Sequence, residues 1–131
     1  DQVVDMLGKA VWLHSYSGSA VTILNGENAR RGIQCISDEP TGTVIEGFTI
    51  KNGSVPYPSS GGGISISYAD VTLRNLIIKE NDAGHSAGGV KLSNGSNSII
   101  ENSSEFPRLS GPMQSFSDAI NIKNPCIRSS T

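Results

Sequence analysis

Short segments that alternate apolar and polar residues recur along the whole chain, with turn residues between them. In each, two apolar side chains flank one different residue, as a half-buried β-strand requires because successive side chains point to opposite faces. The segments begin 22 to 31 residues apart, which is a repeat with loops of unequal length. The pattern predicts a stacked solenoid with one coil per repeat. The first set of predicted strands comprises residues 11–13, 33–35, 64–66, 90–92 and 120–122.

A second set of apolar segments follows the first at a nearly fixed offset, at residues 23–26, 44–50, 72–78 and 99–102. Each contains an apolar residue followed by Gly or Asn, the residue types that best tolerate a left-handed backbone. We therefore expect a corner at this point in every coil. The apolar residues expected to superpose are Leu24, Ile45, Leu73 and Ile100, and the corners are Gly26, Gly47, Asn75 and Asn102.

The polar positions of the two sets predict two outward rows. In the second set the row reads Asn25, Glu46, Arg74 and Glu101, which would place opposite charges on neighbouring strands about 4.8 Å apart. The row of the first set is irregular and charged, which argues against a flat ice-binding surface; it reads Trp12, Gln34, Ser65, Lys91 and Asn121. Loops 52–63, 81–89 and 103–118 are expected to leave the solenoid on one side.

Composition supports a turn-rich fold. The 131 residues (13.7 kDa) include 15 Gly and 6 Pro, and only 36% are hydrophobic, so we expect one domain over residues 1–131 without long amphipathic helices. A net charge of -2 gives no electrostatic reason to expect a nucleic-acid partner. No apolar stretch is long enough to span a membrane. No leader peptide is visible.

The two cysteines, Cys35 and Cys126, are too far apart in sequence for a zinc or redox motif. We interpret them as separate buried core residues, with a disulfide as the alternative. Residues Val3 to Met6 resemble a strand of a preceding coil, so the chain is interpreted as a minimal solenoid or a fragment of a longer one. Open strand edges at the ends predict a homo-oligomer formed through the ends or edges.

Several stretches resemble a known family: TVIEGFTIKNG (43–53), GGGISIS (61–67), VTLRNLIIKEND (71–82) and SAGGVKLSN (86–94). Together with residues 8–32 they are similar to the right-handed parallel β-helix of the pectate-lyase-like superfamily, in particular to bacterial secreted or surface proteins. The resemblance implies an all-β solenoid of about five coils and an extracellular or cell-surface location. Its motifs encode turns and core ladders and carry little information on activity.

The resemblance also implies two candidate chemistries on acidic polysaccharides. Lyases of the superfamily use an Arg or Lys base with calcium held by acidic residues, and the nearest arrangement here is Arg74 between Glu46 and Glu101. Two flanking carboxylates favour the protonated guanidinium, so we interpret the three residues as a structural ion-pair ladder. Calcium is expected only under the lyase hypothesis, and otherwise no cofactor.

Glycoside hydrolases of the fold use grouped aspartates, and Asp38-Glu39 is the nearest acidic pair. The following Pro40 and Gly42 favour a solvated turn in which Asp38 caps the backbone. No Asp-Asp pair accompanies it, which departs from the hydrolase pattern. The two histidines, His14 and His85, are far apart and do not define a metal site.

Exposed aromatic residues suit stacking against sugar rings. The candidates for ligand binding are Trp12, His14, Tyr16 and Tyr68, with Tyr57 as a further aromatic residue. We therefore interpret the chain as a secreted or surface module that binds carbohydrate or protein and is not an enzyme. The alternative is a polysaccharide lyase or glycoside hydrolase domain, or a fragment of one, that acts on acidic polysaccharide.

Overall fold

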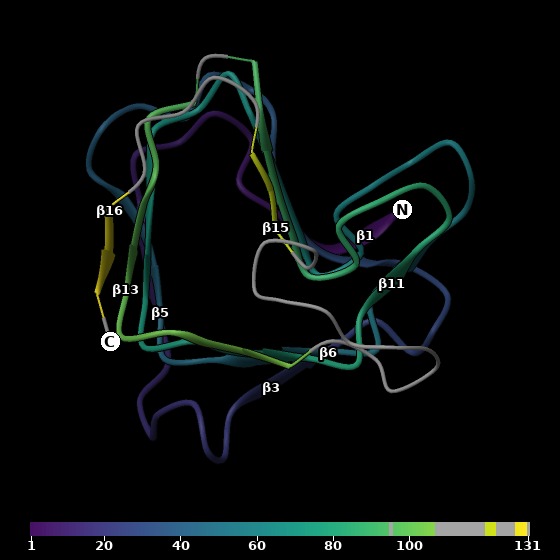
Figure 1. The fold of residues 1–131 in the computed structure, drawn as a ribbon. Coiled ribbons are helices and arrows are strands. Elements are labelled where there is room, and N and C mark those ends of the chain that lie inside the picture. Colours follow the sequence, from purple (N-terminus) through teal and green to yellow (C-terminus); the bar gives the residue numbers. More distant parts are fainter. Residues whose placement is uncertain (95, 107–119, 123–127, 131) are drawn as a thin grey trace.

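The computed structural model shows a parallel β-solenoid, in which short strands wind into stacked coils around one core (Figure 1). It describes residues 1–94, 96–106, 120–122 and 128–130, with side chains up to residue 104. The described elements are all strands, and the coils make about four turns. The predicted fold class is confirmed. No helix among the described residues could cross a membrane.

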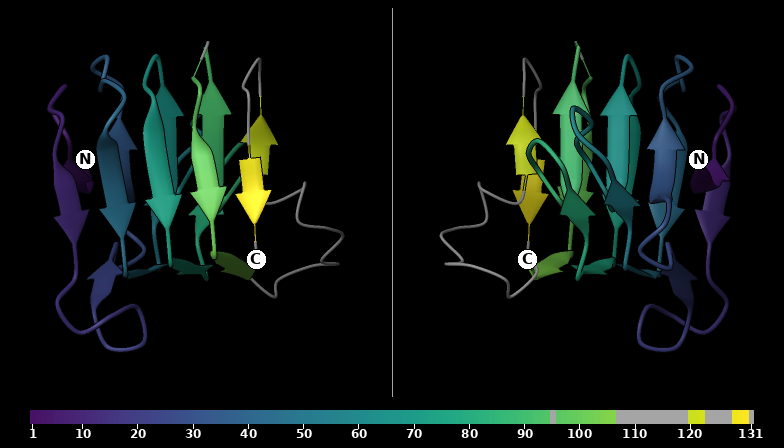
Figure 2. Two further views of the ribbon diagram at one scale, coloured as in Figure 1. Left: turned by 90° about the vertical axis from the view of Figure 1, so that its left-hand side faces the viewer. Right: turned by 90° about the vertical axis from the view of Figure 1, so that its right-hand side faces the viewer.

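Three parallel sheets run along the axis of the solenoid, and Figure 2 shows their strands side by side. Sheet A contains, in order, β1 (Gln2–Asp5), β4 (Arg31–Cys35), β8 (Ile64–Ser67), β12 (Val90–Ser93) and β15 (Ile120–Ile122). Sheet B contains β2 (Trp12–His14), β5 (Thr43–Glu46), β9 (Val71–Arg74), β13 (Ile99–Glu101) and β16 (Arg128–Ser130). Sheet C contains β3 (Ile23–Asn25), β6 (Thr49–Lys51), β10 (Ile77–Lys79) and β14 (Ser104–Phe106).

The core consists of aliphatic ladders that run from coil to coil. The parallel register places equivalent residues on top of each other, so Ile33, Ile64 and Val90 form one ladder in sheet A. Burial of a Val, Leu or Ile side chain contributes about 1.5–3 kcal/mol, so repetition of these ladders supplies the stability of the solenoid. The fully buried large side chains of the ladders are Ile33, Ile45, Ile50, Ile64, Ile66, Leu73, Leu76, Leu92, Val71 and Val90.

The first coil differs from the prediction. The sequence pattern predicts that residues 11–13 lie in the same sheet as residues 33–35. In the structure this segment forms β2, which pairs with β5 in sheet B. The first strand of sheet A is β1, where Val4 pairs with Ile33, so the strand expected at Val3 to Met6 is present. The outward position assigned to Trp12 therefore belongs to Asp5, which pairs with Gln34. A three-residue apolar-polar-apolar pattern cannot distinguish these sheets, because it has the same period in both.

The second set of predicted strands is shifted in the same coil. Leu24 pairs with Ile50 in sheet C, and Leu13 takes the predicted place of Leu24 beneath Ile45. The corner at Gly26 accordingly hydrogen-bonds to the carbonyl of Lys51, one sheet further on than the corner at Gly47. The later superpositions of Ile45, Leu73 and Ile100 are confirmed.

Two loops leave the solenoid together, as predicted, and we call residues 52–63 and 81–89 the lateral wall (Figure 1). They pair through β7 (Ser54–Val55) and β11 (Asp82–Ala83). At the base of the wall, the buried Asn81 donates to the carbonyl of Ile50 and accepts from the amide of Gly53. A Cβ on Gly62 would lie 1.9 Å from the carbonyl oxygen of Asp82, so the glycine run permits this close backbone contact. Most of the third predicted loop, residues 103–118, lies outside the described residues.

Cys35 is a free thiol with no exposed surface, which confirms its predicted place in the core. Cys126 lies outside the described residues.

The corner at Gly47 provides a test of the register between coils. Gly47 has a φ of 83°, and an added Cβ would lie 2.5 Å from Oγ of Ser15 in the previous coil. Gly42 also has a positive φ but open space around its Cβ position, so it is a matched control. We expect Gly42→Ala to lower the free energy of unfolding by about 1–2 kcal/mol through φ alone. Gly47→Ala should cost about 1–3 kcal/mol more because it also crowds the corner. Equal losses in urea denaturation would contradict this stacking.

Candidate functional site

The outer face of sheet B brings together most of the residues proposed from sequence as site candidates. His14, Glu46, Arg74 and Glu101 occupy one register position on four successive strands. The predicted row from Glu46 to Glu101 is confirmed. The assignment of Asn25 to this row is wrong, because β3 belongs to sheet C, and His14 takes its place.

Arg74 is at the centre of this row and contacts a carboxylate on each side. Its Nε lies 3.2 Å from Oε2 of Glu101, and its Nη1 lies 3.7 Å from Oε2 of Glu46. All three side chains keep contact with solvent, so each pair contributes about 0.2–1 kcal/mol. Both contacts engage the guanidinium in ion pairs with acidic residues of the adjacent strands. The arrangement matches the predicted structural ladder.

Trp12 lies on the same strand as His14 and widens this face within the first coil. Its ring centroid lies 4.0 Å from that of His14 in a stacked arrangement, and its indole Nε1 donates to Oε1 of Glu46 at 3.0 Å. The other oxygen of Glu46 accepts from Nδ2 of Asn75 at 3.1 Å. Trp12 is therefore fixed by two contacts while 58% of its surface remains exposed. A rigid aromatic surface next to hydrogen-bonding groups is suited to stacking against a ligand ring.

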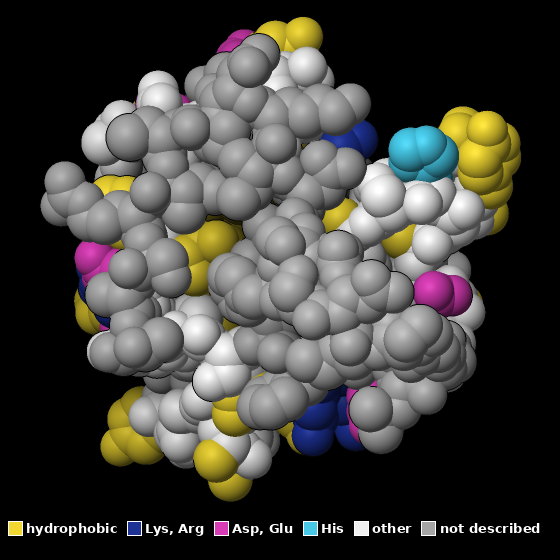
Figure 3. Space-filling model, in the orientation of Figure 1, with side chains coloured by type: hydrophobic (Ala, Val, Ile, Leu, Met, Phe, Trp, Pro, Cys, Tyr) yellow, Lys and Arg dark blue, Asp and Glu magenta, His cyan; other side chains and the backbone are white. Residues whose placement is uncertain are grey.

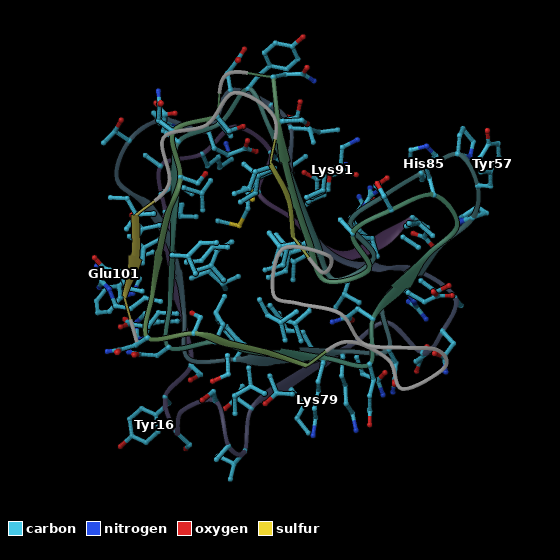
Figure 4. The ribbon with its side chains drawn as sticks, viewed as in Figure 1. Tyr16, Tyr57, Lys79, His85, Lys91 and Glu101 are labelled. Carbon is cyan, nitrogen blue, oxygen red and sulfur yellow. The ribbon has the colours of Figure 1, made fainter. Side chains whose placement is uncertain are left out.

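We call Trp12, His14, Glu46, Arg74 and Glu101 the sheet B face. Two other aromatic candidates lie outside it. Tyr16 is fully exposed in the connection after β2 and points away from the solenoid (Figure 4). Tyr68 is exposed at the corner between β8 and β9. Among the described rings, neither is in contact with Trp12. Of the four proposed ligand-binding residues, the fold therefore places two, Trp12 and His14, on the sheet B face.

The acidic pair Asp38-Glu39 has a structural role, but the residue that caps the backbone is Glu39 and not Asp38. Glu39 caps the backbone: its two carboxylate oxygens accept from the amides of Gly8 and Ser37, each at 3.0 Å. Only 1% of Glu39 is exposed, so the carboxylate joins two coils from inside the corner. Asp38 is exposed with a φ of 58°. The predicted solvent exposure of Asp38 is confirmed, the predicted capping by Asp38 is wrong, and neither residue belongs to the sheet B face.

A second feature, not identified as a site from sequence, lies between sheet A and the lateral wall. Figure 3 shows a notch between the histidine on the wall and the adjacent surface, and Figure 4 shows that Lys91 and His85 lie on its two sides. The wall is attached to sheet A by Arg31, which donates to the carbonyls of Gly61 and Ser60. Burial lowers the pKa of Arg31.

The wall carries an aromatic and hydroxyl cluster. The rings of Tyr57 and His85 have centroids 5.9 Å apart, and Nδ1 of His85 lies 3.2 Å from Oγ of Ser86. The Ser86 hydroxyl lies 3.1 Å from that of Ser60, which is buried. These residues come from two coils, so only the pairing of the two loops places them together. In the sequence, the signal for this pairing is the presence of glycine-rich loops at equivalent places in two successive coils, residues 52–63 and 81–89.

No group of three or more His, Cys, Asp or Glu side chains among the described residues is arranged to hold a metal ion. Cys35 is unsuited to nucleophilic chemistry in the folded protein. Burial raises the pKa of its thiol well above the ordinary value, and the charges of Glu39 and Asp5 add to this effect.

The fixed orientation of Trp12 provides a direct test of the sheet B face, because it is the sole tryptophan of the chain. Glu46→Ala removes the acceptor of the indole N–H, so the ring should become more mobile. We expect faster acrylamide quenching of tryptophan fluorescence than in the wild type. Glu101→Ala removes a carboxylate of the same row that does not contact Trp12, and should leave quenching unchanged. Equal quenching in all three proteins would contradict the described contact.

Comparison with known proteins identifies the architecture. The family model described as "Right handed beta helix region" matches residues 10–129. No curated protein and no solved structure gives a match. The family match assigns the right hand of the coils and carries no activity. Because the match covers nearly the whole chain and the coils stack in parallel register, the chain belongs to the right-handed β-helix family.

Proposed function

We propose that this β-helix is a non-enzymatic module that binds carbohydrate on the sheet B face. The observation that carries the proposal is the exposed Trp12 ring, held in place by His14 and Glu46. A side chain that is already ordered loses little conformational entropy when a ligand binds, which favours affinity. The flat ring supplies stacking area, and the polar groups beside it can bind hydroxyls.

The charge of the face favours a neutral sugar chain. Glu46, Arg74 and Glu101 together carry two negative charges and one positive charge, so the row has no cationic excess for a uronate. The same three residues give little support to the lyase alternative, because the only cation of the row is engaged by both carboxylates. The row continues over three coils, so a linear glycan can follow it along the axis of the solenoid.

The proposal includes an extracellular or cell-surface location. It is supported by the similarity of the coils to bacterial secreted and surface β-helix proteins. A neutral polysaccharide ligand would be encountered in that location.

A glycan array of neutral and uronate-containing polysaccharides tests this function, with affinities then measured by titration. We expect Trp12→Ala to weaken binding of a neutral glycan about tenfold or more, as is typical of a central aromatic contact. Tyr57→Ala is the matched control, because it removes an exposed ring from the lateral wall, and should leave affinity unchanged. Binding that depends on Tyr57 and not on Trp12 would move the site to the lateral wall and overturn the proposal.

An absorbance assay for unsaturated uronate products, on pectate and alginate with and without calcium, tests the lyase alternative. Product formation that Arg74→Ala abolishes would make the sheet B face an active site. We expect no product from the wild type.

Self-association through the open edge of the first coil is a further part of the proposal. Among the described strands, β1, β2 and β3 each form the edge of a sheet, and such an edge presents unpaired backbone groups. Many of the exposed large hydrophobic side chains belong to this coil, namely Val3, Leu7, Val11, Trp12, Tyr16, Val21 and Ile23. We expect light scattering to show an oligomer that Val11→Lys dissociates. A wild-type monomer at high protein concentration would contradict this proposal.

A further inference from the structure

The outer face of sheet C carries two lysines in register. Lys51 on β6 pairs directly with Lys79 on β10, and the preceding member of the row is Asn25 on β3. Neighbouring strands are about 4.8 Å apart, so the two side chains leave the sheet one rung apart. Figure 4 shows Lys79 pointing outward from this sheet, and Figure 3 shows basic side chains gathered on the same side.

This arrangement is the opposite of the one on sheet B. There, each charged residue has an opposite charge on the next strand, as in the contact between Arg74 and Glu101. On sheet C, two like charges are directly opposite each other, which is unfavourable in a sheet. The charges on sheet B are therefore neutralised by their neighbours in the row, whereas the two positive charges on sheet C have no opposite charge in their row.

The described residues do not supply that compensation. Neither Lys51 nor Lys79 forms an ion pair within the part of the chain that the structure describes. The acidic residues nearest to Lys79 in sequence, Glu80 and Asp82, are exposed and form no ion pair among the described residues. Glu46, the nearest to Lys51, contacts Arg74 on sheet B, and Glu27, near the end of β3, is paired with Arg30. Both lysines are only half exposed, so part of each aliphatic stem is covered while the ammonium group reaches solvent.

We infer that Lys51 and Lys79 form a binding site for a phosphate monoester group. Such a group carries a charge of about -1.5 to -2 at pH 7 and offers three acceptor oxygens. Two ammonium groups, each with three donors, match that charge and can bind separate oxygens of one phosphate. A single carboxylate would neutralise only one of the two lysines. The site is on a different face from Trp12 and is independent of the function proposed above.

Inorganic phosphate is the first probe, added at constant ionic strength to the wild-type protein while thermal unfolding is recorded. We expect a saturable rise in Tm, because a ligand that binds only the folded state stabilises it. The rise should diminish at acidic pH, where phosphate loses its second charge. Lys79→Ala and Lys51→Ala should each weaken binding at least fivefold. Lys91→Ala, a half-exposed lysine of sheet A, should bind phosphate as the wild type does.

Lys79→Glu separates a ligand site from a purely structural pair. It places opposite charges on the two strands, as on sheet B, so its Tm without phosphate should equal or exceed that of the wild type. Its response to phosphate should be lost. An equal phosphate response in Lys79→Glu and the wild type would overturn the inference, and so would a lower Tm of Lys79→Glu without phosphate.

The source of the phosphate group is distinguished by a second probe, a phosphorylated dextran compared with unmodified dextran. Binding of the phosphorylated polymer at least tenfold tighter than inorganic phosphate, and dependent on Lys51 and Lys79, would indicate a phosphorylated glycan. Equal affinity per phosphate would indicate a small phosphorylated molecule. Retention of polymer binding in Lys79→Glu would count against the site. Failure of Trp12→Ala to affect neutral glycans would leave this result unchanged, because the two tests use different faces and probes.

Discussion

Parallel pairing of each strand with its equivalent in the next coil is the constraint on which this structure depends. Once Ile33 is paired with Ile64, and Ile64 with Val90, every other side chain of those coils is assigned to the core, a corner or the surface. A slip by one residue would turn the buried ladder to solvent, because side chains alternate between the two faces of a strand. The apolar ladders thus fix the register, and the register determines which polar residues become neighbours.

The same pairing explains why surface features of this protein form rows and layers. On sheet B it aligns Glu46, Arg74 and Glu101, whereas on sheet C it aligns Lys51 with Lys79. It also stacks two excursions into the lateral wall through β7 and β11. Each feature uses residues that are distant in sequence, so a binding surface is assembled by adding coils rather than by shaping one loop.

The two rows have different physical consequences. A row of alternating charges is satisfied within the protein, so it offers hydrogen bonds to a ligand without requiring a charged one. A row of like charges is stabilised when an anion approaches. The exposed Trp12 adds an apolar platform to the first row, and this combination is the basis for the proposal that sheet B binds sugar. The surface chemistry of a β-helix is therefore set by outward residues that the core does not constrain.

From the sequence alone, the all-β solenoid, the inward ladders, the Gly and Asn corners after the first coil and the row from Glu46 to Glu101 could be predicted. These features are local patterns repeated at a regular interval, and repetition itself indicates stacking. The tertiary structure alone decided the first coil, where the three-residue strands at 11–13 and 23–25 are each one sheet further along than expected. Such short strands have the same two-residue period in every sheet, so only their backbone partners distinguish them. The pairing of β2 with β5 places His14 beside Glu46 and brings the indole N–H of Trp12 within hydrogen-bonding distance of Glu46. Contact with the previous coil likewise makes Glu39, and not Asp38, the buried cap. These positions depend on hydrogen bonds between segments that are distant in sequence, so local sequence patterns do not determine them.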